Sequence, residues 1–148
     1  LFYTSKRRFS PNKDKSVMTV TALAPPILVL ADVTYPRERK GAISIPGRSA
    51  LDFLTNKTNN IHGNQPIGWE LYGNRALIKG NHKLVLTWPP EGTGRWELYD
   101  IQSDPAEGVD ISSDYPDLTK ELINDWIIYA KENGVAVFER DIGYGRYP

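Results

Sequence analysis

The stretch of sequence that decides the fold is residues 66–88, PIGWELYGNRALIKGNHKLVLTW. Two runs rich in strand-forming residues, 75–79 and 83–88, flank Gly80-Asn81, a dipeptide suited to a tight hairpin turn. In the second run every other residue is leucine or tryptophan, so one face of that strand should be buried. The stretch therefore predicts an antiparallel hairpin.

Downstream, a loop rich in proline and glycine leads to a third predicted strand, 95–99, and then to a helix from about Pro116 to Asn133. Asp114 is expected to cap this helix and Gly134 to end it in a left-handed conformation. Its buried stripe should consist of Leu118, Leu122, Trp126 and Tyr129. The predicted fold class is α+β, a small antiparallel sheet of three to four strands packed against a C-terminal helix over residues 67–134. Residues 135–148 form a tail.

Upstream, the sequence predicts a first helix at about residues 20–33. Pro25 and Pro26 fit its first turn, where a missing N–H costs little, and the hydroxyls of Thr19 and Thr21 are possible caps. Helical spacing places Leu23, Ile27, Leu30 and Ala31 on its buried face. Residues 34–66 are expected to form a long connecting loop that holds one short helix, 49–54.

Composition excludes several classes of function. Eighteen basic residues balance eighteen acidic ones, so the chain has no overall field that attracts nucleic acid, although Lys6-Arg7-Arg8 forms a local basic run. The absence of cysteine rules out disulfides and thiolate metal sites. The longest apolar run, 22–31, is broken by prolines and is well short of the ~20 residues that span a bilayer. We expect neither a nucleic-acid partner nor a membrane span.

Four segments in a fixed order carry a family resemblance. They are VTALAPPILVLADV (20–33), the loop from Lys40-Gly41 to Leu51, PIGWELYGNRAL (66–77), and GRWELYD (94–100) followed by D-P-x-E-x-x-D (104–110). These segments are similar to the C-terminal portion of type I sulfatases, the arylsulfatase branch of the alkaline-phosphatase superfamily. The resemblance implies that the sheet and its helix are the sulfatase C-terminal subdomain. It also implies that residues 1–66, with the first helix, end the catalytic α/β domain.

The chain departs from the family pattern in the first helix. Ala22 stands where the family has an aspartate before the helix, Pro26 replaces a threonine, and Asp32 replaces a glycine. Losing a capping side chain typically costs about 1 kcal/mol. We therefore expect this helix to be less stable than its counterparts in the family.

The resemblance also implies which chemistry is missing. Sulfatases of this type use a formylglycine made from the cysteine of a C-x-P-x-R motif and a calcium ion held by aspartates and an asparagine. Both belong to the larger N-terminal region, so this chain is expected to hold no catalytic residue, metal ligand or cofactor. The sequence opens at Leu1 without a methionine, and we interpret it as a fragment. Its expected partner is the N-terminal catalytic domain of the same protein, which acts on a sulfate ester.

Two motifs in the chain could be mistaken for sites. Ser44-Ile45-Pro46-Gly47-Arg48 fits S-x-P-x-R, the serine form of the nucleophile motif, but it follows the first helix whereas the family motif precedes it. We interpret it as a surface loop. Asp100, Asp104 and Asp110 resemble a metal loop, but their spacing is wrong for an EF-hand, so turn and cap roles are expected.

Three residues are candidates for the rim of the parent's substrate pocket: His62, Trp69 and Glu70. They lie at the end of the long loop, and connecting loops often carry sites. Trp69 has a competing interpretation as a core anchor. His82, beside the hairpin turn, is expected to be exposed to solvent.

Two other functions remain open. The chain could be a free-standing, non-catalytic binding module, or a fragment of a related phosphodiesterase or phosphonate ester hydrolase. In the sulfatase interpretation, the first helix and the sheet face away from helix 116–133 should have packed against the missing domain, leaving an apolar patch.

Overall fold

The computed structural model describes residues 17–33, 49–55 and 57–138. The chain divides into two compact units, Leu1–Gly63 and Asn64–Pro148, and each is described by itself. In the described ranges, no helix combines the length and the apolar character needed to cross a membrane.

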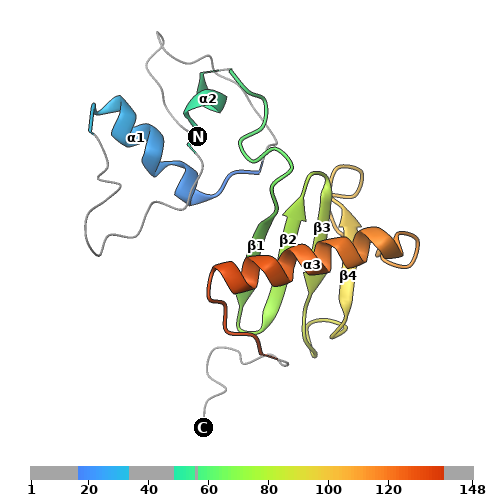
Figure 1. Cartoon of the computed structure of the whole chain (residues 1–148). Coiled ribbons are helices and arrows are strands. Elements are labelled where there is room, and N and C mark those ends of the chain that lie inside the picture. The colour runs from blue at the N-terminus through green and yellow to red at the C-terminus, as the bar shows by residue number, and fades with distance from the viewer. Residues whose placement is uncertain (1–16, 34–48, 56, 139–148) are drawn as a thin grey trace. The chain divides into compact units, whose positions relative to one another are not determined.

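The second unit is built on a four-stranded antiparallel sheet (Figure 1). Its strands are β1 (Ile67–Leu71), β2 (Asn74–Lys79), β3 (His82–Leu86) and β4 (Trp96–Asp100), and they follow the sheet in chain order. The strands are joined in chain order by residues 72–73, 80–81 and 87–95, so the sheet is a simple meander. The predicted antiparallel sheet of three to four strands is confirmed, and it has four.

Two tight turns fix the register of the first three strands. Lys79 pairs with His82 across Gly80-Asn81, and Gly80 has a φ of 60°, as expected of a two-residue hairpin loop. Leu71 pairs with Asn74 across Tyr72-Gly73, where φ is 54° and 91°. The second turn was not predicted, because tyrosine rarely adopts a left-handed conformation. A hydrogen bond of 2.7 Å from the Gly73 N–H to Glu70 Oε1 supports this turn.

Helix α3 (Pro116–Glu132) lies across one face of the sheet (Figure 1). Alternate residues of the strands point to the same face, and the buried ones meet a stripe of α3. The resulting core consists of Leu77, Leu84, Leu98, Leu122, Trp126 and Ala130, with Leu118 and Tyr129 packed at its margin. The predicted buried stripe of the helix is therefore confirmed. The predicted end of the helix is also confirmed, because Gly134 adopts a left-handed conformation with a φ of 63°.

The predicted cap of α3 is wrong. Tyr115, not Asp114, is the N-cap residue, and it makes no side-chain cap hydrogen bond. The N–H groups of Asp114 and Tyr115 both donate to Ile111 O at 3.1 Å, so Asp114 belongs to the turn that precedes the helix. Pro116 at the first helical position has no N–H to satisfy, which reduces the need for a cap.

The first unit contains α1 (Ala24–Leu30), preceded by a 3₁₀ turn (Val20–Ala22), and the short α2 (Leu51–Leu54). The two prolines do lie in the first turn of α1, as predicted. The prediction that Thr19 and Thr21 cap the helix is wrong. Their Oγ1 atoms hydrogen-bond each other at 2.8 Å, and neither the 3₁₀ turn nor α1 has a side-chain hydrogen bond at its N-cap.

α1 is shorter than predicted, and Pro26 is its buried residue. Asp32 has a φ of 55°, so the backbone turns left-handed at the position where the family has glycine, and the helix ends at Leu30. On the predicted buried face, Ile27 is 62% exposed and Leu30 45% exposed. Ala22 is fully buried instead, in a small cluster with Ala50 and Ile61.

Candidate functional site

The candidate rim residues Trp69 and Glu70 point to opposite faces of β1. Trp69 pairs with Ala76 and Glu70 with Arg75, and neighbouring side chains of a strand alternate between faces. Trp69 lies on the face away from α3 and is 40% exposed, so it is not the core anchor of the competing interpretation. Glu70 lies on the α3 side. The structure therefore does not bring these two side chains together.

The Glu70 carboxylate has a structural contact of its own. Its Oε1 accepts the Gly73 N–H, and its charge acts on Tyr129 of α3. The pKa of the Tyr129 hydroxyl is raised above its ordinary value, first by burial and then by the negative charge of Glu70. Glu70 thus supports the turn after β1 and lies close to the helix.

His62 belongs to the other unit. It is half-buried, and its backbone N–H donates to Asn60 Oδ1 at 3.0 Å, as does the N–H of Gly63. Thr58 Oγ1 donates to Asn60 O at 3.0 Å, so these residues form a compact turn. The pocket-rim role of His62, Trp69 and Glu70 stays a prediction.

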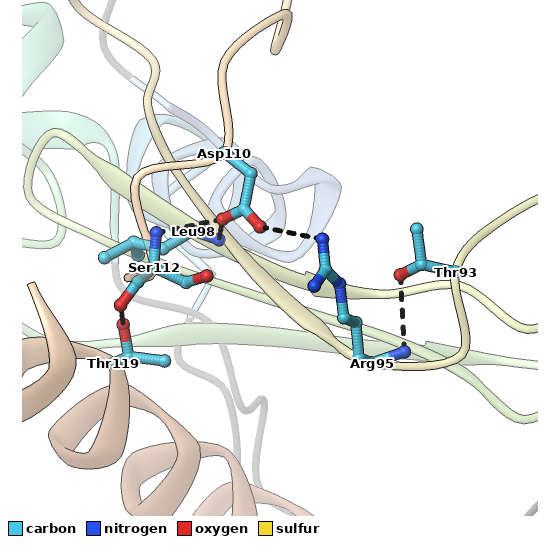
Figure 2. Close-up of polar contacts among 6 residues, drawn as sticks. All are labelled: Thr93, Arg95, Leu98, Asp110, Ser112 and Thr119. Carbon is cyan, nitrogen blue, oxygen red and sulfur yellow. Dashed lines mark hydrogen bonds and ion pairs between the residues drawn. The ribbon is translucent and has the colours of Figure 1, made fainter. Parts of the chain in front are cut away.

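The aspartates of the predicted turns do act as turn and cap residues. Asp110 Oδ1 accepts the N–H groups of Leu98 at 3.0 Å and Ser112 at 2.9 Å, while Oδ2 lies 3.7 Å from Arg95 Nη2 (Figure 2). Burial raises the pKa of Asp110, but the hydrogen bonds from Ser112 and Leu98 and the charge of Arg95 together hold it below its ordinary value. Asp110 therefore ties the chain that returns from β4 to that strand.

Asp100 and Asp104 have similar roles. Asp100 Oδ1 accepts the Gln102 N–H at 3.0 Å, and this bond is the main reason that its pKa is lowered. Asp104 Oδ2 accepts the N–H groups of Gly108 at 2.7 Å and Val109 at 2.9 Å. Across residues 17–33, 49–55 and 57–138, no three His, Cys, Asp or Glu side chains are grouped as metal ligands.

Sequence reasoning missed two charged contacts beneath α3. The guanidinium of Arg75 lies 5.0 Å from the ring centre of Trp126 and 5.9 Å from that of Trp88, and it donates to Phe138 O. Lys79 Nζ contacts Glu121 Oε1 and Asp125 Oδ2, each at 2.7 Å. The pKa of Lys79 is raised, first by the hydrogen bond to Asp125 and then by that to Glu121. The sequence feature that could have revealed these contacts is the alternation of side chains along β2. It places Arg75 and Lys79 on the same face as the core residue Leu77.

On the face of the sheet away from α3, the half nearest β1 is mainly apolar and the half nearest β4 is polar. Strand registers place six apolar side chains there, on β1, β2 and β3, and we call them the apolar half-face: Ile67, Trp69, Leu71, Ala76, Ile78 and Val85. Leu71 is 64% exposed. The remainder of the face is polar, with Lys83, Glu97 and Tyr99.

Comparison with known proteins gives a match in sequence. The chain is 34% identical over 135 residues to an uncharacterized sulfatase of Schizosaccharomyces pombe. That match covers 84% of this chain but 23% of the relative, so the chain spans about a quarter of the length of the sulfatase it resembles. No family model matches the chain.

Solved structures share the fold. A protein labelled 6S-sulf, from a glycosaminoglycan-metabolism locus of Bacteroides thetaiotaomicron, matches with a TM-score of 0.65 at 17% identity, over 85% of this chain and 27% of that one. BT4656, solved with its substrate D-glucosamine-2-N,6-O-disulfate, matches with a TM-score of 0.56 at 21% identity, over 76% and 24%. At such identities the structural matches establish the fold alone. The chain is therefore similar in sequence to a sulfatase over most of its own length and shares the fold of sulfatase structures, which is consistent with a sulfatase C-terminal region.

Proposed function

We propose that this chain is the C-terminal part of an arylsulfatase-like sulfuric ester hydrolase and that the chain is inactive alone. The observation that carries the proposal is the unequal coverage of the sequence match, 84% of this chain against 23% of the relative. A match of that kind is expected when one polypeptide corresponds to one part of a longer one. The nucleophile and the metal site would then lie in the rest of the protein.

The described residues support this division of labour. Sulfuryl transfer needs positive charge or a metal ion to stabilise the negative charge that develops on the transferred group. Two basic side chains among the described residues of the second unit are instead engaged with acidic ones: Lys79 with Glu121 and Asp125, and Arg95 with Asp110. These contacts place the positive charges of Lys79 and Arg95 in the scaffold.

Among the residues that the structure describes, the candidate aspartates do not fit the calcium ion that the family implies. Asp100 ends β4, Asp104 and Asp110 follow in the loop after it, and each accepts backbone N–H groups. A carboxylate oxygen that points at an N–H is not oriented toward a cation. The chain also lacks the cysteine from which formylglycine is made, and Ser44 lies outside the described residues. Calcium and formylglycine are therefore proposed for the longer protein alone.

The contacts of the three candidate rim residues favour two of them over the third. Trp69 presents an exposed ring, whereas the Glu70 carboxylate is bound to the adjacent turn. His62 and Trp69 are consequently the better candidates to reach a substrate held by the rest of the protein. Their replacement by alanine in the longer enzyme should raise KM more than it lowers kcat, because rim residues bind substrate without joining the chemistry.

The proposal is tested by assaying turnover of nitrophenyl sulfate. The purified chain of 148 residues should give no turnover with or without calcium, while the longer protein that contains it should be active. Ser44→Ala in the short chain is the matched control. Calcium-dependent turnover by the short chain that disappears in Ser44→Ala would overturn the proposal and make Ser44 a nucleophile precursor.

A further inference from the structure

We propose that residues 135–138, the first part of the predicted tail, form a strap that Arg75 locks onto the second unit. Gly134 ends α3 in a left-handed conformation, and the chain turns away from the helix there (Figure 1). The strap is held at both ends: Val135 packs against the core, and Phe138 O accepts a hydrogen bond from the Arg75 guanidinium. The folded unit thus extends past its last helix to Phe138.

The near end of the strap is fixed by the end of α3. The Val135 N–H donates to Ala130 O at 2.9 Å, and the Gly134 N–H donates to Lys131 O at 3.4 Å. These are the two bonds of a Schellman motif, which satisfy carbonyl groups that a helix end leaves without a partner. The Val135 side chain packs against the core that contains Trp126 and Ala130. One backbone bond and one apolar contact therefore hold the same residue.

The far end of the strap is held by a single guanidinium. Arg75 lies near the start of β2, 5.0 Å from the ring centre of Trp126 on α3 and 5.9 Å from that of Trp88, which follows β3. Phe138 O adds a hydrogen-bond acceptor. A planar guanidinium can stack on aromatic rings and donate hydrogen bonds from its edge at the same time, whereas a lysine ammonium is a compact charge without a plane to stack. Arg75 therefore joins segments from four parts of the unit.

The two indole rings that hold Arg75 are themselves oriented by the β1–β2 hairpin. Trp88 Nε1 donates to Gly73 O at 3.0 Å, and Trp126 Nε1 donates to Trp69 O at 3.2 Å. Neither of these hydrogen bonds involves the strap, so the rings keep their positions when the strap is released. Segments held by few contacts open at lower free energy than the core to which they are attached. The strap is therefore a local device that opens while the sheet and α3 stay folded.

Backbone NMR relaxation of the 148-residue chain tests the strap. A rigid backbone gives order parameters of about 0.85, and a flexible one gives values below about 0.6. Residues 136–138 should be rigid in the wild type and fall below about 0.6 in Arg75→Lys. Leu77, in the core strand β2, should stay rigid in both proteins. Arg95→Lys is the matched control: Arg95 lies beside Asp110 instead, so residues 136–138 should remain rigid.

Two results would overturn the proposal. Flexible residues 136–138 in the wild type would show that nothing holds the segment, and equally rigid ones in Arg75→Lys would show that Arg75 does not lock it. If Arg75→Lys gives no folded spectrum, Val135→Ser is the second variant. It removes the apolar contact at the near end, so the order parameters of residues 136–138 should fall while Leu77 stays rigid. Unchanged values at residues 136–138 in Val135→Ser would refute the strap.

Discussion

Gly68 on β1 provides the sharpest test of how α3 packs on the sheet. A Cβ atom added at Gly68 would lie 2.4 Å from Tyr129 Cδ1 and 2.5 Å from Tyr129 Cγ. Favourable carbon contacts lie at about 3.5–4.0 Å, so Gly68→Ala creates a direct clash. Cγ is the root of the ring and moves little when the ring turns. The helix or the strand must therefore shift.

The size of the effect follows from two opposing contributions. Overpacking of this kind costs about 1–3 kcal/mol. Replacing a strand glycine by alanine recovers about 0.5–1 kcal/mol of backbone entropy. The net loss is about 0–2.5 kcal/mol with a central value near 1 kcal/mol, and for a unit of under a hundred residues each kcal/mol lowers the melting temperature by about 4–8 °C. We expect Gly68→Ala to lower the melting temperature of the 148-residue chain by about 4–8 °C.

Thermal unfolding followed by far-UV circular dichroism measures this loss. Gly108→Ala is the matched control, because a Cβ there meets only the Asp104 carboxylate, at 3.9 Å, and it should melt close to wild type. In a Tyr129→Ala background, Gly68→Ala should cost little, since the clashing ring is gone. If Gly68→Ala melts with wild type and with Gly108→Ala, α3 does not lie on β1 as described and the reasoning is refuted.

Three further predictions concern stability of the same unit. Lys79→Met should be less stable than wild type near neutral pH. Because the pKa of Lys79 is raised on folding, this difference in stability should shrink as the pH rises above the ordinary lysine value of 10.5. A stability difference that stays constant above pH 10.5 would contradict the prediction. Asp110→Asn should lose less stability than wild type as the pH falls below 3.8. The pKa of Asp110 is lowered in the folded protein, so the carboxylate's contribution to stability is lost when it is protonated. Parallel acid-unfolding curves of the two proteins would argue against a stabilising role of the Asp110 carboxylate. Leu122→Ala should cost about 2–5 kcal/mol in urea unfolding, since the side chain is fully buried, and a cost below about 1 kcal/mol would place Leu122 outside the core.

The sheet and α3 were predictable because their signals are periodic. Alternation in β3 and helical spacing in α3 each depend on many residues, and both elements bury one face. The turn at Tyr72-Gly73 was not predictable in the same way, because it depends on one tyrosine with a φ of 54° that Glu70 helps to hold. Turns set by a single side-chain contact leave little trace in local sequence.

The first unit shows a different limit. Periodicity placed Ile27 and Leu30 on a buried face, but the structure exposes them and buries Ala22 instead. A helical pattern predicts which residues share a face but not whether a partner is present to cover it. For the candidate site, alternation along β1 was sufficient to separate Trp69 from Glu70. The contacts of Arg75 and Lys79 required knowing which helix crosses β2.

The most direct test of the central claim is the size of the natural polypeptide that contains these residues, measured as an intact mass together with its upstream reading frame. The relative is about four times longer than the matched segment, so we predict a protein several times heavier than 16.7 kDa. Its upstream sequence should contain a C-x-P-x-R motif that precedes α1. A mature protein of 16.7 kDa, encoded from a start codon directly before Leu1, would contradict the account.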